Sequence, residues 1–302
     1  MIKLYDRIYK RIGSEIYYRY PRWRKYMPDK MYLQCIWRDN MGYELDVENP
    51  QTFNEKLQWL KLYNRKSVYT TMVDKATAKE YVASIIGEEY IIPTYGVYNT
   101  FDEIDFGGLP NQFVIKSTHD SGGVYICKDK SKLDKEKARS ITEGRFGVNV
   151  YHNFREWPYK NVKPRILVEK YMENEECNGL VDYKFYCFNG KAKYLYVSEG
   201  LENHKTAKIS FLTLDWEFAP FGRSDFSPFS ILPPQPSRFK EMVKIANILA
   251  ERHPFIRVDL YQVKNKIYFS ELTFYPCAGM MPFEPKEWDY KLGLELTLEK
   301  NR

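Results

Sequence analysis

The chain has 302 residues, of which 44% are hydrophobic and 28% charged, and its net charge is +6. This composition supports a packed core in one large domain or in two to three smaller lobes. No run of about 20 apolar residues occurs, which excludes a membrane-spanning helix of the usual kind. Charged residues interrupt every apolar segment near the N-terminus, so no signal-peptide core is expected.

The five cysteines predict a reducing compartment rather than a disulfide framework. None of them forms a C-x-x-C pair, and with only four histidines the chain has no zinc pattern. Scattered, odd-numbered thiols in a chain of this length are typical of a cytosolic protein. The expected location is therefore cytoplasmic.

Residues 1–40 are predicted to be helical, basic and aromatic, with breaks at Pro21 and Pro28. They hold ten Lys or Arg and four acids, a balance of +6, so residues 41–302 sum to about zero. Such a helix is typical of contact with an anionic membrane surface, here the inner face of the cell membrane. The alternative is a helical cap packed on the main domain. Nucleic-acid binding is not expected, because the positive charge is confined to this segment and no recognised module is present.

Two helices are predicted next. Residues 52–63 form an amphipathic helix in which Thr52 and Glu55 have the spacing of a capping box. A second helix, within residues 72–86, is expected to begin at Asp74 and to end at Gly87. Tyr90 to Pro93 is then expected to enter a strand.

Residues 113–127 predict a strand, a loop and a second strand. Lys116 closes the first strand, and the loop at 117–123 is small, polar and contains glycine. Backbone N–H groups of such a loop can hold phosphate oxygens, with Lys116 as a fixed positive charge. An ordinary hairpin turn is the common alternative, and the loop is not a Walker loop.

Further along, a strand is predicted at 165–172 and a hairpin at 182–198, around Asn189-Gly190. Residues 205–232 are expected to be rich in loops. Residues 237–252 have the periodicity of an amphipathic helix, and a last short helix is expected in the tail.

The strongest chemical signal lies in a hairpin predicted for residues 256–274, with a three-residue turn at 264–266. That turn places Asp259 opposite Glu271, on the face that also carries Arg257. A two-residue turn would break this pairing, because a one-residue slip moves a whole strand to its other face.

Two opposed carboxylates repel each other unless positive charge lies between them. Mg²⁺ takes one or two carboxylates together with phosphate oxygens, and Arg257 could bind an anionic phosphate or intermediate. The alternative is a surface hairpin whose carboxylates form ion pairs with Arg257.

The order of these motifs resembles the ATP-grasp fold. The residues that carry the resemblance are Asp74-Lys75, Val114-Ile115-Lys116 with its Ser-Gly-Gly loop, Leu167-Val168-Glu169-Lys170-Tyr171-Met172, Asp182 and Lys184, Arg257 and Asp259, and Glu271 and Thr273. The general likeness is to D-alanine–D-alanine ligase. More narrowly, the helix from Phe53, the His119-containing loop and Glu-Leu-Thr-Phe-Tyr-Pro at 271–276 are similar to the TupA-like ATP-grasp proteins of bacterial teichuronopeptide, capsule and O-antigen gene clusters. The likeness covers most of the chain from about residue 50.

This resemblance implies an α+β fold in which antiparallel sheets of two lobes clasp ATP. It divides the chain into a helical basic N-terminal segment at 1–70 and an ATP-grasp domain at 71–302. Within that domain, the lid lobe is expected at about 110–168 and the metal-binding lobe at about 180–302.

The resemblance also implies site residues, with ATP and Mg²⁺ as cofactors. The residues implied for the nucleotide are Lys75, Lys116, Ser121, Gly122, Gly123, Glu169, Lys170, Tyr171, Met172 and Glu176, with Glu175 as the alternative to Glu176. Asp259 and Glu271 would bridge the metal, beside Thr273, which stands where many ATP-grasp enzymes have Asn. The residues implied for catalysis are Lys184 at the terminal phosphates, Arg257 facing an acyl-phosphate, and His119. His119 is considered as a base because the ordinary pKa of histidine lies near neutrality. The alternatives are that it donates a hydrogen bond to phosphate or that it packs the loop.

The activity so implied is ATP-dependent amide formation between a carboxylate and an amine. In the TupA-like setting, the carboxylate would be a uronic acid of a surface glycan or lipid-linked sugar, and the amine an amino acid or amino sugar. The alternatives are a glycosyltransferase, for which no convincing Asp-x-Asp motif is present, a kinase on the same fold, and a non-catalytic partner that binds glycan or membrane.

Overall fold

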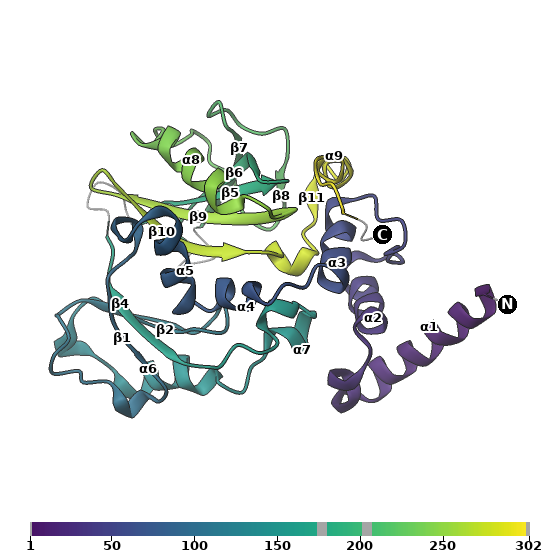
Figure 1. The fold of residues 1–302 in the computed structure, drawn as a ribbon, viewed down its shortest axis with the longest axis horizontal. Coiled ribbons are helices and arrows are strands. Elements are labelled where there is room, and N and C mark those ends of the chain that lie inside the picture. Colours follow the sequence, from purple (N-terminus) through teal and green to yellow (C-terminus); the bar gives the residue numbers. More distant parts are fainter. Residues whose placement is uncertain (1, 174–179, 201–206, 300–302) are drawn as a thin grey trace.

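The computed structural model describes residues 2–173, 180–200 and 207–299, and its centre is a pair of antiparallel sheets (Figure 1). The four-stranded sheet has the order β1 (Thr94–Tyr98), β4 (Ile166–Lys170), β2 (Phe113–Ser117), β3 (Val124–Cys127). The five-stranded sheet has the order β10 (Lys266–Thr273), β9 (Phe255–Val263), β5 (Asp182–Phe188), β6 (Lys191–Glu199), β7 (Lys208–Thr213). β8 (Gly222–Arg223) and β11 (Phe283–Glu284) form a small third sheet.

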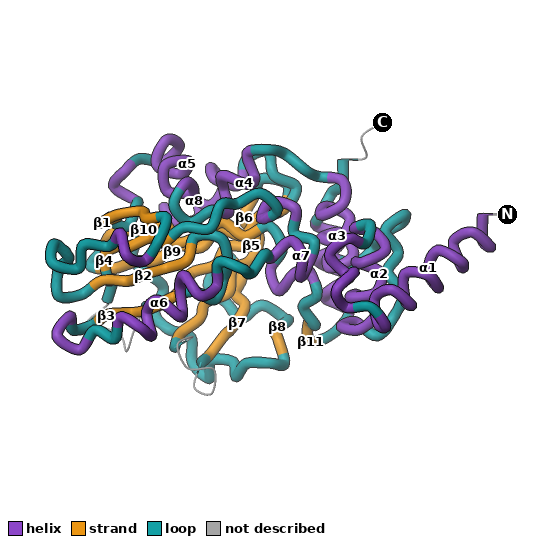
Figure 2. Tube along the Cα trace, turned by 90° about the horizontal axis from the view of Figure 1, so that it is seen from below, coloured by secondary structure: helices purple, strands orange, loops and turns teal. Residues whose placement is uncertain are grey.

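Helices cover and connect these sheets. They are α1 (Ile2–Arg19), α2 (Asp29–Met41), α3 (Phe53–Tyr63), α4 (Val68–Val73), α5 (Thr77–Ile86), α6 (Lys135–Thr142), α7 (Val150–Phe154), α8 (Phe239–Ala250) and α9 (Glu287–Glu295). α6 packs on β2 and β3, whereas α8 packs on β5, β6 and β9. α4 and α5 pack against β10, at the edge of the five-stranded sheet. Figure 2 shows the same arrangement from below.

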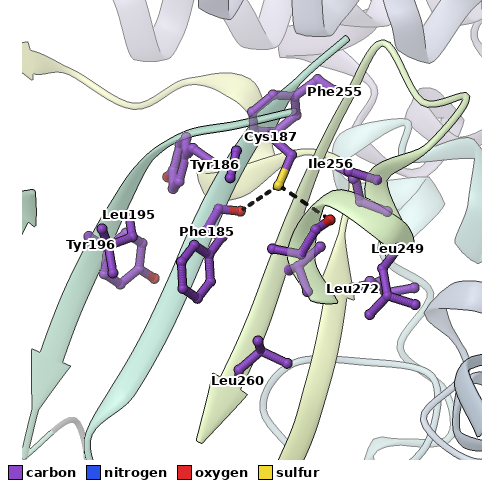
Figure 3. Packing of buried hydrophobic residues seen from close by; sticks show 14 of the residues in the cluster. Phe185, Tyr186, Cys187, Leu195, Tyr196, Leu249, Phe255, Ile256, Leu260 and Leu272 are labelled. Atoms are coloured by element: carbon purple, nitrogen blue, oxygen red, sulfur yellow. Dashed lines mark hydrogen bonds between the residues drawn. The ribbon is translucent and has the colours of Figure 1, made fainter. Parts of the chain in front are cut away.

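The largest core lies between the five-stranded sheet and α8. Residues of β5, β9 and β10 belong to it, including Phe185, Val258 and Leu272, which are at most 3% exposed. Figure 3 shows Phe185 and Leu272 together with the thiol of Cys187, which lies 3.9 Å from the carbonyl oxygen of Ala246 on α8. Burial of this apolar face fixes the direction in which the alternating polar residues point.

The N-terminal helices have a small core of their own. Leu33 and Trp37 of α2 are fully buried in it, and the N-terminal half of α1 extends away from the rest of the chain (Figures 1 and 2). By contrast, α3 packs in the main core through Phe53 and Leu57, although it falls inside the segment predicted as 1–70. The division into domains stays a prediction. In the described part of the chain, no helix is both long enough and apolar enough to cross a bilayer.

Several local predictions are confirmed by hydrogen bonds and dihedral angles. The Thr52 hydroxyl accepts from the amide of Glu55 (3.2 Å), and the Glu55 carboxylate accepts from the amide of Thr52 (3.0 Å), which completes the capping box. Asn189 and Gly190 form the β5–β6 turn with φ of 48° and 82°, as a tight hairpin requires.

Other boundaries are corrected. Asp74 does not begin a helix: it ends α4, its carboxylate accepts from the amide of Ala76 (2.9 Å), and α5 begins at Thr77. The strand expected at 90–93 begins at Thr94 instead. The loop-rich stretch contains the edge strand β7, whose pairing with β6 no local signal had indicated.

The hairpin of β9 and β10 has a different turn from the one predicted. Two residues, Lys264 and Asn265, connect the strands, and both have positive φ (47° and 61°). A β-bulge between Phe269 and Glu271 adds one residue to β10 and restores the predicted pairing of Glu271 with Asp259. The predicted turn is therefore wrong, whereas the predicted pairing is right for another reason.

Candidate active site

A row of polar residues crosses four strands of the five-stranded sheet. Tyr196 on β6 pairs with Lys184 on β5, Lys184 pairs with Asp259 on β9, and Asp259 pairs with Glu271 on β10. Directly paired residues share a face. The alternation that buries the apolar residues under α8 therefore places this row on the opposite face.

Asp259 is the buried centre of the row, with no exposed surface. Arg257 donates to both of its carboxylate oxygens, each at 2.7 Å, and the ammonium of Lys184 donates at 2.9 Å. Burial lowers the pKa of Arg257 and of Lys184, but the Asp259 carboxylate and the other acidic groups around them together outweigh it and raise both pKa values. The ion pairs of the surface-hairpin alternative are thus present, but they lie in the interior.

Glu271 faces open space instead, with 40% of its side chain exposed. One of its oxygens accepts from Arg257 (2.7 Å) and from the hydroxyl of Thr273 (3.1 Å). Burial acts to raise the pKa of Glu271, but Arg257, Lys184 and Lys75 prevail and lower it to about 2. A carboxylate that is ionised and accessible in this way suits Mg²⁺.

Of the two predicted metal ligands, Glu271 is accessible to a metal ion and Asp259 is not. Within the described residues, no three His, Cys, Asp or Glu side chains form a metal-binding group. A metal shared by Asp259 and Glu271 would have to displace the guanidinium of Arg257, so the bridge stays a prediction. Glu271 together with phosphate oxygens of a nucleotide can hold Mg²⁺ without that displacement.

The loop between β2 and β3 meets the row from the other lobe. The amide of Lys75 donates to the carbonyl of Thr118 (3.0 Å), and its ammonium donates to the carbonyl of Asp120. The Asp120 side chain in turn accepts from Ser117 and Arg145. The loop is thus held in place by its own acid and by a lysine from the α4–α5 connection.

The predicted loop residues lie at different depths. Ser121 lines the cavity described below. At Gly122 a Cβ would lie 2.8 Å from the guanidinium of Arg145, and at Gly123 a Cβ would collide with Ser117. Both glycines therefore allow a close approach.

His119 is 3% exposed and does not line this cavity. Its Nε2 lies 3.1 Å from the carbonyl oxygen of Arg145, and its ring packs edge-on against Phe146. This geometry corresponds to the loop-packing alternative for His119. Its catalytic role stays a prediction.

Glu169 forms a second charged centre, on β4. Its two oxygens pair with the ammonium groups of Lys116 and Lys79, each at 2.5 Å. Burial would raise the pKa of this 3% exposed carboxylate, but the two lysines lower it. Lys79 was not among the predicted residues.

The segment after Glu169 was predicted to meet a nucleotide base. The amide of Lys170 donates to the carbonyl of Pro93 (2.9 Å), and the side chain of Met172 packs with Ile92. Tyr171 is half-buried and stacks with the ammonium of Lys128. Glu175 and Glu176, predicted for the ribose, lie outside the described residues.

A cavity of about 500 Å³ lies between the loop and the row. Its charged lining comprises Lys75, Asp120, Arg145, Glu156, Arg257 and Glu271. The three cations of this lining, together with Glu271, fit a magnesium-bound polyphosphate, because each phosphate oxygen can take a charge-assisted hydrogen bond. Arg145 and Glu156 were missed from the sequence, since they lie in a polar connection that carries no motif.

One family model and several solved structures are similar to this chain. A family model described as TupA-like ATPgrasp matches residues 55–297. No curated protein matches. Similar solved structures include the ATP-grasp ligase PsnB complexed with a phosphomimetic variant of minimal precursor, Mg and ADP, at 9% identity over 73% of this chain and 57% of that one, with a TM-score of 0.38.

Two further solved structures are bacterial ligases. D-alanine–D-alanine ligase from Bacillus anthracis is 19% identical over 67% of this chain and 56% of that one, with a TM-score of 0.37. L-amino acid ligase from Bacillus licheniformis is 12% identical over 82% and 55%, with a TM-score of 0.43. The chain thus spans a little over half the length of these proteins. The predicted α+β fold with antiparallel sheets is confirmed, and the match over residues 55–297 shows that the chain belongs to the TupA-like ATP-grasp family.

Proposed function

We propose that this chain is an ATP-dependent carboxylate–amine ligase, which forms an amide through an acyl-phosphate. The observation that carries the proposal is the cavity with Arg257 and Glu271 on one wall and Lys75 on the other. Phosphoryl transfer depends mainly on positioning and on stabilising negative charge. This cavity supplies fixed cations from two lobes, together with a carboxylate that can hold a divalent ion.

The residues divide the work by position. Glu169 accepts from an adenine amino group, while Lys116 beside it reaches toward the phosphates. Lys75 balances phosphate charge from the loop side. Glu271 would hold Mg²⁺, whose charge would neutralise phosphate oxygens, and Arg257 orients the carboxylate that is phosphorylated.

We infer the substrates from the family and from the size of the site. The carboxylate is a uronic acid of a bacterial surface polysaccharide, or of its lipid-linked precursor, and the amine is an amino acid or amino sugar. A cavity of about 500 Å³ suits a ligand of this size.

Residues 1–40 bring the enzyme to the inner membrane surface in this proposal. Trp23 and Tyr26 are 63% and 69% exposed, and they lie among Arg22, Arg24 and Lys25. Such a cluster suits anionic headgroups. The same segment also packs on the main domain, since the Tyr32 hydroxyl donates to the carbonyl of Asn153 (2.9 Å), so the cap alternative applies to part of it.

Calorimetry with ATP, with and without Mg²⁺, tests the nucleotide site, with Glu271→Ala as the variant. ADP release is then measured with glucuronate, galacturonate and the corresponding UDP-sugars as carboxylates, and with amino acids and glucosamine as amines. Glu136→Gln, on the exposed surface of α6, is the matched control. Mg²⁺-dependent binding that is lost in Glu271→Ala, with ADP release that needs both substrates, is expected. Absent or metal-independent ATP binding would overturn the proposal.

A further inference from the structure

Glu156 is a buried acid that the proposed ligase chemistry leaves without a task. It lies between α7 and a short 3₁₀ turn (Trp157–Tyr159), and it lines the cavity beside Phe154 and Tyr159. Only 8% of the residue is exposed. Among the residues that the structure describes, none donates a hydrogen bond to its carboxylate or forms an ion pair with it.

A buried carboxylate normally receives hydrogen bonds, because leaving it unpaired is costly. The neighbouring cation, Lys61 on α3, is fully buried but donates to the carbonyls of Phe154 (2.9 Å) and Ala278 (2.7 Å). The carboxylate oxygens of Glu156 are also not among the fully buried polar atoms that lack a hydrogen-bond partner. It is therefore open to whatever occupies the cavity.

The surroundings of Glu156 bring the pKa of its carboxyl group close to 7. Burial raises its pKa to about 7, although Lys61 acts in the opposite direction. The other titratable groups around it are Tyr159, from its own turn, and Tyr275, whose pKa values burial raises so far that both stay neutral. Burial lowers the pKa of Lys61 to about 8. A group with a pKa near the working pH both accepts and releases protons readily.

We propose that Glu156 binds the amine co-substrate and takes its proton, acting as the general base of amide formation. This inference rests on the proposed ligase function and adds a group to the same cavity. An ammonium ion supplies the hydrogen bonds and the positive charge that this carboxylate lacks. Arg257, which lines the same cavity, would hold the acyl-phosphate within reach of the amine, while Glu271 would hold the divalent ion beside it.

The step balances in atoms and charge. The substrate R′NH₃⁺ gives one proton to Glu156 and becomes R′NH₂. Its nitrogen lone pair forms the C–N bond as the C–O bond to phosphate breaks, and the electrons of that bond leave with the phosphate. The second nitrogen proton passes to the leaving phosphate, which departs as HPO₄²⁻, and Glu156 releases its own proton to solvent.

The first experiment compares two nucleophiles with Glu156→Gln. Hydroxylamine is uncharged at neutral pH and needs no base, whereas an amino acid arrives as an ammonium ion. With the carboxylates named above, the variant should lose amine-dependent turnover by about 100-fold or more. Its hydroxamate formation should stay within about threefold of the parent chain, and the acidic limb of the pH profile for the amine should disappear. Glu136→Gln should change neither reaction.

The outcomes separate the two proposals. Unchanged amine turnover in Glu156→Gln would overturn the role of Glu156. So would equal losses with both nucleophiles, since these indicate a structural part. No ADP release by the parent chain with either nucleophile, across the whole panel, would instead overturn the ligase function.

A second experiment needs no substrate. A water-soluble carbodiimide with glycine ethyl ester couples to protonated carboxyl groups, and mass spectrometry locates the product. At pH 6.5, Glu156 should react at least ~10-fold faster than Glu136, whose environment is solvent. No reaction at Glu156 would show that its carboxyl group is sealed or ionised, and would overturn the inference even if the ligase activity is found.

Discussion

Asp259 and Glu271 lie opposite each other on β9 and β10 and share the guanidinium of Arg257, yet one is sealed and the other is open. Asp259 has no exposed surface, whereas 40% of the Glu271 side chain is exposed. The two carboxylates therefore have different roles. Asp259 balances buried cations, and Glu271 is available to a ligand.

Replacing Asp259 by Asn should destabilise the fold. Arg257 and Lys184 would keep their charges in the interior without a carboxylate, and breaking such a buried pair costs about 3–5 kcal/mol. Urea unfolding followed by circular dichroism measures this loss, with Glu136→Gln as the control. A change below about 1 kcal/mol would show that Asp259 is not needed to balance these cations.

Replacing Glu271 by Gln should remove metal dependence while leaving the fold intact. The amide keeps the shape of the side chain and can still accept from Thr273, but it no longer offers a charge to Mg²⁺. The Kd for ATP in the presence of Mg²⁺ is expected to rise about 100-fold, a loss of roughly 3 kcal/mol. Calorimetry in EDTA should give equal, weak binding for both proteins. If the variant kept Mg²⁺-dependent affinity, the metal would have to bind elsewhere.

Lys79→Met should weaken recognition of the adenine base. Glu169 would keep only its ion pair with Lys116. The hydrogen bonds from the Lys79 ammonium to the carbonyl of Ile92 (2.8 Å) and to the hydroxyl of Thr94 (2.9 Å) would also be lost. A mobile Glu169 discriminates less between ATP and inosine triphosphate, which lacks the amino group. We expect ATP affinity to fall about 10-fold, with little change for inosine triphosphate. Lys137→Met, on the exposed face of α6, is the control, and an equal loss for both nucleotides would count against the role of Glu169.

His253 should make stability depend on pH. Its ring packs against Tyr69 and Phe274, and burial, with Lys66 adding to it, lowers its pKa to about 4. The unfolded chain binds this proton near pH 6.5, so the stabilising contribution is complete above that value and is lost as the pH falls toward 4. The pKa difference of about 2.5 corresponds to roughly 3 kcal/mol.

His253→Phe provides the test of this dependence. The phenyl ring fits between the same aromatic neighbours but does not titrate. Urea unfolding between pH 7 and pH 4 should show a steeper loss for the parent chain than for the variant. Parallel curves would mean that His253 is not buried in its neutral form.

The sequence was sufficient at two places where a local rule decides the structure. The capping box at Thr52 and the turn at Asn189 depend on residues a few positions apart, and both were found. The family resemblance assigned Lys184 and Asp259 to one site, but their direct pairing on β5 and β9 is known only from the structure.

The rest depended on contacts that no local pattern encodes. The bulge before Glu271 is one extra residue on β10, and only the packing of both strands on the sheet reveals it. Arg145 and Glu156 enter the cavity from a polar connection, where a single sequence gives no period to follow. Lys79 was missed for the same reason, because its partner Glu169 is far away in the sequence.

Lys75 connects the two lobes through hydrogen bonds. It belongs to the connection between α4 and α5, which pack on the edge of the C-terminal sheet, but its amide and its ammonium bind the loop of the other lobe. If the lobes move apart, the ammonium must exchange the Asp120 carbonyl for another partner. A phosphate oxygen is a stronger acceptor than that carbonyl, so a bound polyphosphate would compete with Asp120 for this ammonium group.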